Sequence, residues 1–207
     1  MVHPYRERNM ATLAHKLGFQ FHPEDDYGIQ AQLQDFRLFS EGRSKSIDRI
    51  MRKQDGLMDF DIAIFDYSYQ PWSSSAKDKR VHQTVFFVQS AKLGLPDLWL
   101  QPETLVHKMG ELLGFTDIDF VRFPKFSGHY RLTGGDEEYI RHHFTDEVLN
   151  YFTMNKGWSM EGMGFYLLFY RKGTLIPSAQ IEQFYKRGQG VYKMMTDEAA
   201  QNEIFGT

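Results

Sequence analysis

Two strand-like runs joined by a short charged bend constrain this fold more than any other feature of the chain. Residues 65–88 have the sequence FDYSYQPWSSSAKDKRVHQTVFFV, in which β-branched and aromatic residues lie on both sides of a serine-rich stretch. Just before it, apolar side chains alternate at Phe60, Ile62 and Ile64, which is the period of a strand. The pattern predicts an antiparallel pair of strands whose serine-rich bend is a solvated hairpin tip.

Other segments predict more strands and several helices. We expect extended segments at residues 19–23, 36–40, 95–103, 117–123 and 129–135, and a hairpin within residues 158–173. Residues 41–56 fit a helix by the spacing of Ile47, Ile50 and Met51, but the strand-like neighbours favour a strand. We expect helices at residues 5–17, 103–113, 136–144, 145–152 and from Pro177 onward.

This order of elements predicts an α+β fold, mainly antiparallel, with helices packed on one face of the sheet. The chain has 207 residues, a length that suits one domain or two small lobes. Each half has strands followed by a helix, so we expect two similar lobes at residues 1–102 and 103–196. Residues 197–207 are expected to fray, and a single undivided domain is the alternative.

Composition argues against several classes of function. The formal net charge is −3, so the chain lacks the basic surplus that attracts nucleic acid. It has no cysteine, which excludes disulfides, thiolate catalysis and cysteine metal sites. Neither an apolar signal core nor a membrane-length apolar run is present. We therefore expect a soluble, cytoplasmic protein that does not insert into a membrane.

Asp66 is the candidate acid of this chain. It shares the alternating parity of Phe60 and Ile64, so its side chain should point toward the core. A buried carboxylate needs hydrogen-bond partners or a raised pKa. One interpretation is a structural ion pair. The other is a catalytic acid that works with His82 or His129 in a cleft between the two lobes.

The bend offers a candidate binding site. Lys77, Lys79 and Arg80 lie close to Trp72, and such a group can hold a phosphate or stack on a base. The alternative is a solvated connection with no ligand, which the three serines and the mixed charges also favour.

The last expected helix offers a second candidate surface. The chain has ten methionines, and Met194 and Met195 follow Tyr192 near the end of this helix. Methionines fill irregular gaps in a core or form an adaptable surface for a partner. If these side chains are exposed, they favour a partner site.

Acidic pairs and histidines do not indicate a metal site or a cofactor. The acidic pairs at 59–61 and 117–119 alternate with apolar residues, which is typical of the solvent-facing side of a strand. Adjacent histidines 142 and 143 point about 100° apart on a helix, so one should pack inward and one should face water. The zinc motif H-E-x-x-H and the nucleotide-binding glycine loops are absent. We expect no metal and no cofactor.

Several segments in order carry a resemblance to a known family: LFSEG, IFDYSY, HQTVFFV, LPDLWLQPE, FVRFPKFSGHYRLTGGDEEYIRHHFT and GWSMEGMGFYLLFYRKG. Over residues 8–195, the chain resembles an uncharacterised bacterial family of unknown function. The resemblance implies an envelope- or membrane-linked context and no known activity. Some members carry apolar helices that this chain lacks.

Taken together, these patterns favour a non-catalytic binding or scaffold module that binds an unidentified protein partner or associates with itself. The alternative is a hydrolase or phosphoryl-transfer enzyme that uses Asp66 with a nearby histidine. A third hypothesis is a single-strand nucleic-acid binder that uses the Trp72–Arg80 bend, and its affinity would fall steeply with salt.

Overall fold

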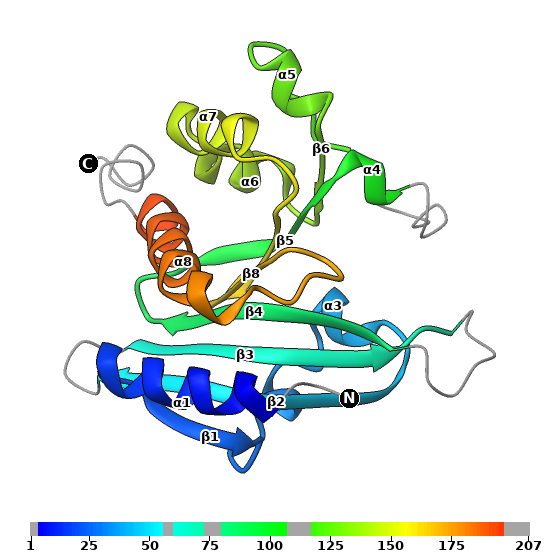
Figure 1. Ribbon diagram of the computed structural model, residues 1–207. Helices are drawn as coiled ribbons and strands as arrows, with labels where there is room; N and C mark the ends of the chain where they lie inside the picture. The colour runs from blue at the N-terminus through cyan, green and yellow to red at the C-terminus, as the bar shows by residue number, and fades with distance from the viewer. Residues whose placement is uncertain (1–3, 56–59, 73–79, 107–116, 197–207) are drawn as a thin grey trace. The chain divides into compact units, whose positions relative to one another are not determined.

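The computed structural model describes residues 4–55, 60–72, 80–106 and 117–196 (Figure 1). The chain forms two compact units, residues 1–89 with 170–188 and residues 90–169 with 189–207. Each unit combines antiparallel strand pairs with helices, which confirms the predicted α+β class. The predicted lobe boundary near residue 102 stays a prediction.

In the described residues of the first unit there are four strands, with helices before, between and after them. Its elements are α1 (Pro4–Leu17), β1 (Gln20–Glu24), α2 (Ile29–Gln32), α3 (Arg37–Ser40), β2 (Arg43–Asp55), β3 (Phe60–Gln70), β4 (Val81–Ser90), the 3-10 helix η1 (Ser178–Gln180) and the first part of α8 (Ile181–Met195). The strands follow the spatial order β1-β2-β3-β4, and α1 packs on β1 and β2.

Strand β2 confirms the strand prediction for residues 41–56, and it is irregular at two places. Its pairing with β3 shifts register between Arg43 and Ser46 and again between Asp48 and Met51. Each shift adds one residue to β2, as in a β-bulge, which bends a strand and re-aims its side chains. Ser44 and Arg49, one within each shift, both have a φ of 52°, an uncommon conformation for residues with a side chain.

Strand β3 is buried on both faces, which corrects one expectation. From Asp61 to Gln70 every side chain is buried, including the aromatic pair Phe65 and Tyr67. Asp61 was expected to face solvent, but it is 7% exposed. The Arg52 guanidinium pairs with its carboxylate. This ion pair allows the Asp61 side chain to be buried at a position where alternation alone predicts exposure to solvent.

The segment at residues 36–40 is a second correction, because the expected strand is the short helix α3. Leu38 and Phe39 are buried there, and the Phe39 ring packs 4.5 Å from the ring of Tyr67, centroid to centroid. A five-residue segment with apolar side chains at three positions fits a strand or a buried helical turn equally well by periodicity. The burial of Leu38 and Phe39 favours the helical turn.

Helix α8 approaches β4 closely in this unit. A β-carbon added at Gly188 would lie 2.4 Å from the ring of Phe86, so only glycine fits this position without movement. The neighbouring side chains Phe184 and Ile181 are also buried. This face of α8 therefore packs into the core of the first unit.

The described residues of the second unit form four further strands and short helices. Its elements are β5 (Leu95–Pro102), α4 (Glu103–Val106), α5 (Pro124–Ser127), β6 (Tyr130–Gly134), α6 (Glu137–His143), α7 (Asp146–Met154), β7 (Ser159–Gly164), β8 (Tyr166–Tyr170) and the last part of α8. The strands follow the spatial order β8-β7-β5-β6, and β5 pairs antiparallel with both β6 and β7.

Side-chain caps start the two central helices of this unit, which lie within two residues of the predicted ranges. The Asp136 side chain accepts a hydrogen bond from the Tyr139 amide at the start of α6. The Thr145 hydroxyl does the same for the Val148 amide in α7. Such caps satisfy amides that have no partner within the helix.

Residues 117–123 correct a third expectation, because they form a loop and turn instead of a strand. The Asp117 carboxylate accepts a hydrogen bond from the Leu132 amide, and the Ser127 hydroxyl accepts one from the Phe120 amide. These contacts hold the segment beside β6 without a regular ladder. Of the expected helix at 103–113, residues 107–113 lie outside the described residues.

Within the described ranges, no helix is long and apolar enough to cross a membrane. The same ranges contain no group of three or more histidine, aspartate or glutamate side chains that could hold a metal ion. Of the adjacent histidines, His143 is 5% exposed and packs inward, and its Nδ1 lies 3.0 Å from the Tyr139 carbonyl oxygen. His142 is half-buried.

Candidate functional site

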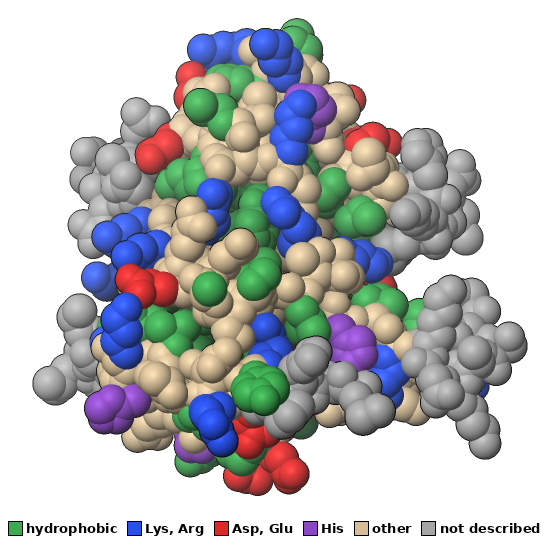
Figure 2. All heavy atoms as spheres, in the orientation of Figure 1, with side chains coloured by type: hydrophobic (Ala, Val, Ile, Leu, Met, Phe, Trp, Pro, Cys, Tyr) green, Lys and Arg blue, Asp and Glu red, His purple; other side chains and the backbone are tan. Residues whose placement is uncertain are grey.

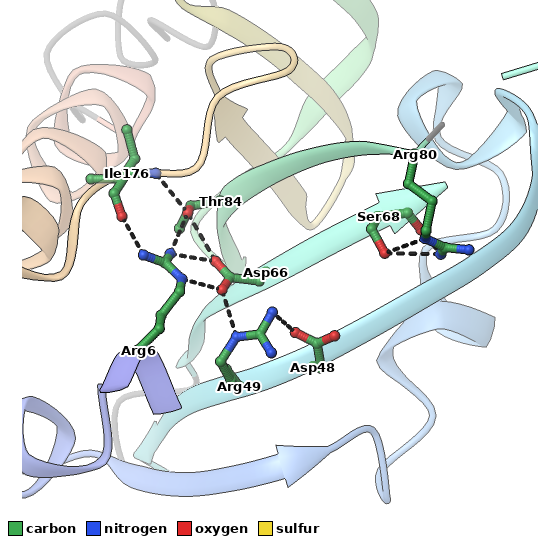
Figure 3. Close-up of polar contacts among 8 residues, drawn as sticks. All are labelled: Arg6, Asp48, Arg49, Asp66, Ser68, Arg80, Thr84 and Ile176. Atoms are coloured by element: carbon green, nitrogen blue, oxygen red, sulfur yellow. Dashed lines mark hydrogen bonds and ion pairs between the residues drawn. The ribbon is translucent and has the colours of Figure 1, made fainter. Parts of the chain in front are cut away.

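The Asp66 carboxylate lies at the centre of a buried charge network in the first unit (Figure 3). Arg6 donates from Nε to Oδ2 at 2.6 Å and from Nη2 to Oδ1 at 2.7 Å. Arg49 Nε donates to Oδ2 at 2.8 Å, and the Thr84 hydroxyl donates to Oδ1 at 2.9 Å. The Asp66 side chain is 2% exposed and each arginine side chain is 10% exposed. As the parity of β3 predicted, Asp66 therefore points into the core.

The second bulge of β2 positions Arg49 in this network. Asp48 of β2 lies opposite Asp66 of β3 in the register, and two like charges in such a cross-strand pair repel each other. Arg49 follows at the bulge and its guanidinium contacts both carboxylates, Asp66 through Nε and Asp48 through Nη2. A cation placed between two facing carboxylates turns a repulsive pair into a bridged one.

Asp48 is the member of this group whose protonation is displaced. Burial raises the pKa of its carboxyl from 3.8 to about 6, although the neighbouring Arg49 charge acts in the opposite direction. The nearby negative charge of Asp66 raises the pKa further. Asp48 can therefore change charge in mildly acidic solution, where most aspartates remain ionised.

Thr84 and Ile176 close the network. The Thr84 oxygen donates to Asp66 and accepts from Arg6 Nη2 and from the Ile176 amide, both at 3.0 Å. The Ile176 carbonyl accepts from Arg6 Nη1 at 2.7 Å. A hydroxyl has one donor and two acceptor positions, and all three are used here. The network thus joins α1, β2, β3, β4 and the segment before α8.

The arrangement leaves Asp66 little capacity for acid–base chemistry. A carboxylate offers about four lone-pair positions, and Asp66 accepts four hydrogen bonds. A proton acceptor must be within hydrogen-bond reach of the proton that it takes, so a substrate would have to displace one of these donors. The geometry matches a structural ion cluster better than an available catalytic base.

The two histidines proposed as partners of Asp66 are placed differently. Burial lowers the pKa of His82 below its ordinary value of 6.5, and the positive charges of Arg80 and Arg49 lower it further. This shift favours the neutral form of His82. His129 belongs to the second unit, and its Nε2 lies 2.9 Å from Lys156 Nζ. The catalytic alternative with Asp66 stays a prediction.

The bend between β3 and β4 is described only at its two ends. Trp72 is 70% exposed, whereas Lys77 and Lys79 lie outside the described residues. Arg80 folds back on the sheet: its Nη2 donates to the Ser44 carbonyl at 2.6 Å and to the Ser68 hydroxyl at 2.9 Å. Arg80 therefore has a structural role at the first bulge, and its part in ligand binding stays a prediction.

The candidate surface at the end of α8 contains one core residue. Met195 is 2% exposed and belongs to the core. Tyr192 is half-buried, and its hydroxyl lies 2.9 Å from the Ser90 hydroxyl oxygen. Met194 is also half-buried and lines an open groove in the second unit.

This groove has a volume of about 870 Å³. Its apolar lining comes from the 120–123 loop, α6, α7 and α8, and consists of Phe120, Val121, Phe123, Phe144, Leu149 and Met194. Phe144 and Leu149 are buried and form its floor, whereas Val121 is 94% exposed. An isolated exposed valine is ordinary, but one beside a groove lined by aromatic rings is typical of a binding surface.

Charged side chains also line the groove. They are Asp119, Arg122, Arg141, Asp146 and Glu147. Arg141 is already occupied, because Nε and Nη2 both donate to Glu137 and Nη1 donates to the Asp119 carbonyl. Its guanidinium carbon also lies 5.0 Å from the centroid of the Phe120 ring. Arg141 thus fixes the loop that carries the exposed apolar residues.

Sequence reasoning missed this groove, although it identified Met194. The lining residues are distant in sequence, and the 117–123 segment was expected to be a strand that would point Phe120 and Arg122 to the same face. The usable signal was the repeated phenylalanine in FVRF: the Phe120 ring packs on Phe126 and Phe144, and both phenylalanines of FVRF line the groove. On the face shown in Figure 2, basic side chains are spread among acidic and hydrophobic ones and do not form one stripe.

Comparisons with known proteins give one structural match. No known protein family matches the chain, and no match is found among curated proteins. Among solved structures, the chain is similar to the crystal structure of the mycobacterial trehalose monomycolate transport factor A, TtfA. The TM-score is 0.63 and the sequence identity is 12% over 94% of both chains. The two chains therefore share a fold.

Proposed function

We propose that this protein is a non-catalytic binding module and that the groove of its second unit is the binding site. The observation that carries the proposal is the combination of buried phenylalanine and leucine side chains in the groove floor with Val121, which is 94% exposed, at its edge. Exposed apolar surface beside a groove costs solubility unless a ligand or partner covers it.

The charge network of the first unit supports the same proposal. A catalytic carboxylate needs an open position for substrate or water, and Asp66 uses about as many acceptor positions as a carboxylate has. The shared fold adds general support for a role in binding. The neighbouring structure is named as a transport factor, and we extend to this chain only the idea of an accessory protein that acts by binding.

A comparison of two surface variants tests the proposal. Val121→Glu places a charge at the edge of the groove, whereas Met154→Glu places one at another exposed position, 82% exposed, outside the groove lining. Both changes should leave the fold intact, because exposed substitutions alter stability by only about 0.5 kcal/mol or less. We expect proteins or ligands that co-purify with the wild type to be lost with Val121→Glu and retained with Met154→Glu, as measured by quantitative mass spectrometry. Equal retention by both variants would contradict the proposal.

A further inference from the structure

Among the residues that the structure describes, the groove has more negative than positive side chains that are left without an ion-pair partner. The lining contains the carboxylates Asp119, Asp146 and Glu147 and the guanidinium groups of Arg122 and Arg141. Glu137, outside the lining, compensates the Arg141 charge.

Arg122 lies 3.5 Å from Asp146, with both side chains largely exposed. In the part of the chain that the structure describes, Asp119 and Glu147 form no ion pair. The unpaired charge of the groove is therefore negative.

The groove has an apolar floor between these charges and is open to solvent. A lipid chain or a small apolar ligand is usually enclosed over most of its surface, which an open groove cannot do. An amphipathic helix needs only one covered face, and its apolar residues at positions i, i+3, i+4 and i+7 follow a groove of this kind. Its polar edges would then face Asp119 and Glu147.

We propose that the groove binds an amphipathic helix of a protein partner whose apolar stripe is flanked by lysine or arginine. This inference rests on the proposed function and specifies the class of partner. Apolar side chains of the helix contact Phe120, Phe123 and Met194, and the basic flank contacts the unpaired carboxylates. Met194 suits this role because an unbranched thioether side chain adapts to different apolar surfaces.

A pair of synthetic helical peptides tests the partner class on the full chain. Both carry the same leucine stripe; one has lysine on its flanks and its twin has glutamate. We expect the lysine peptide to bind about tenfold more tightly at low salt, because complementary charges favour one partner and like charges disfavour the other. The ratio should fall as salt rises, since exposed charges are screened over about 8 Å at physiological ionic strength. Fluorescence anisotropy of labelled peptides measures both affinities.

Two further variants locate the charge effect. In Asp119→Lys/Glu147→Lys, the preference for the lysine peptide should disappear or reverse. The control Asp97→Lys/Glu138→Lys makes the same change at two exposed positions outside the lining and should keep the preference. Equal affinity of the two peptides, or loss of the preference in both double variants, would overturn the proposal. Dimerisation of the chain that Val121→Glu abolishes would also overturn it, because a second copy would then be the occupant.

Binding of a fluorescent apolar dye separates failure of this inference from failure of the proposed function. If the dye binds the wild type and not Val121→Glu while the peptides bind equally, the groove is a binding site and only the partner class is wrong. If neither the dye nor a peptide binds in a manner that depends on Val121, the proposed function fails as well.

Discussion

Replacing Asp66 by asparagine should destabilise the protein strongly, because it removes the carboxylate that both Arg6 and Arg49 contact. Asparagine has nearly the same shape but no charge, so Arg6 loses its counter-ion and Arg49 keeps only Asp48. These guanidinium side chains are each 10% exposed, so water replaces the lost interaction poorly. Removing one partner of a buried ion pair costs about 3–5 kcal/mol, and we expect a loss in this range.

Urea unfolding followed by tryptophan fluorescence measures this loss as a shift of the midpoint at constant slope. Asp97→Asn makes the same chemical change at an exposed aspartate, and its free energy of unfolding should change by about 0.5 kcal/mol or less. A loss under about 1 kcal/mol for Asp66→Asn would refute the reasoning, because it would mean that water or a rearranged side chain satisfies both arginines. If the network served catalysis instead of stability, Asp66→Asn would show this small loss of stability together with a loss of activity.

Three further changes test separate features of the fold. The wild type should lose stability relative to Asp48→Asn as the pH rises from about 4 to about 6. The reason is that the folded state raises the Asp48 pKa to about 6, so the folded protein binds that proton more tightly than the unfolded chain does. If the difference in unfolding free energy between the two proteins does not change with pH, the reasoning is wrong. Gly188→Ala should cost about 1–3 kcal/mol, since the added methyl would overlap the Phe86 ring, and a midpoint equal to that of wild type would show that α8 moves freely. Asp136→Ala should lower the free energy of unfolding by about 1 kcal/mol, because the Tyr139 amide loses its cap. The α6 amides should then exchange hydrogen faster, and an unchanged exchange rate would mean that the cap is dispensable.

The sequence predicted much of the fold because its strands carry strong local signals. Alternation at residues 60–64 and the apolar runs at 81–90 and 158–173 predicted strands that the structure contains. The helices expected at 136–144 and 145–152 are also present, as α6 and α7. Residues 36–40 and 117–123 failed because short aromatic runs fit more than one conformation. Tertiary packing decides such segments, and a single sequence does not display that packing.

The site could be predicted only in part, for a related reason. The parity of β3 placed Asp66 in the core, but nothing local identified its partners, which lie 60 and 17 residues away at Arg6 and Arg49. The same alternation wrongly placed Asp61 in water, because a strand covered on both faces can bury polar residues that an arginine neutralises. The groove was missed because three separate segments of the second unit build it.

The charged side chains around Asp66 are buried in the first unit and those of the groove are exposed in the second, and this difference is the strongest reason to assign a structural role to the first group and a binding role to the second. In the first unit, Asp66 and both arginines are almost fully buried and every oxygen of the carboxylate is occupied. Such a network joins α1, β2, β3 and β4, and it leaves the Asp66 carboxylate no acceptor position for a ligand. In the second unit, Asp119 and Glu147 remain exposed beside apolar residues. Exposed charges contribute little to stability, whereas charges at the rim of an interface select partners. This difference is the basis on which we propose the groove as the site of partner binding.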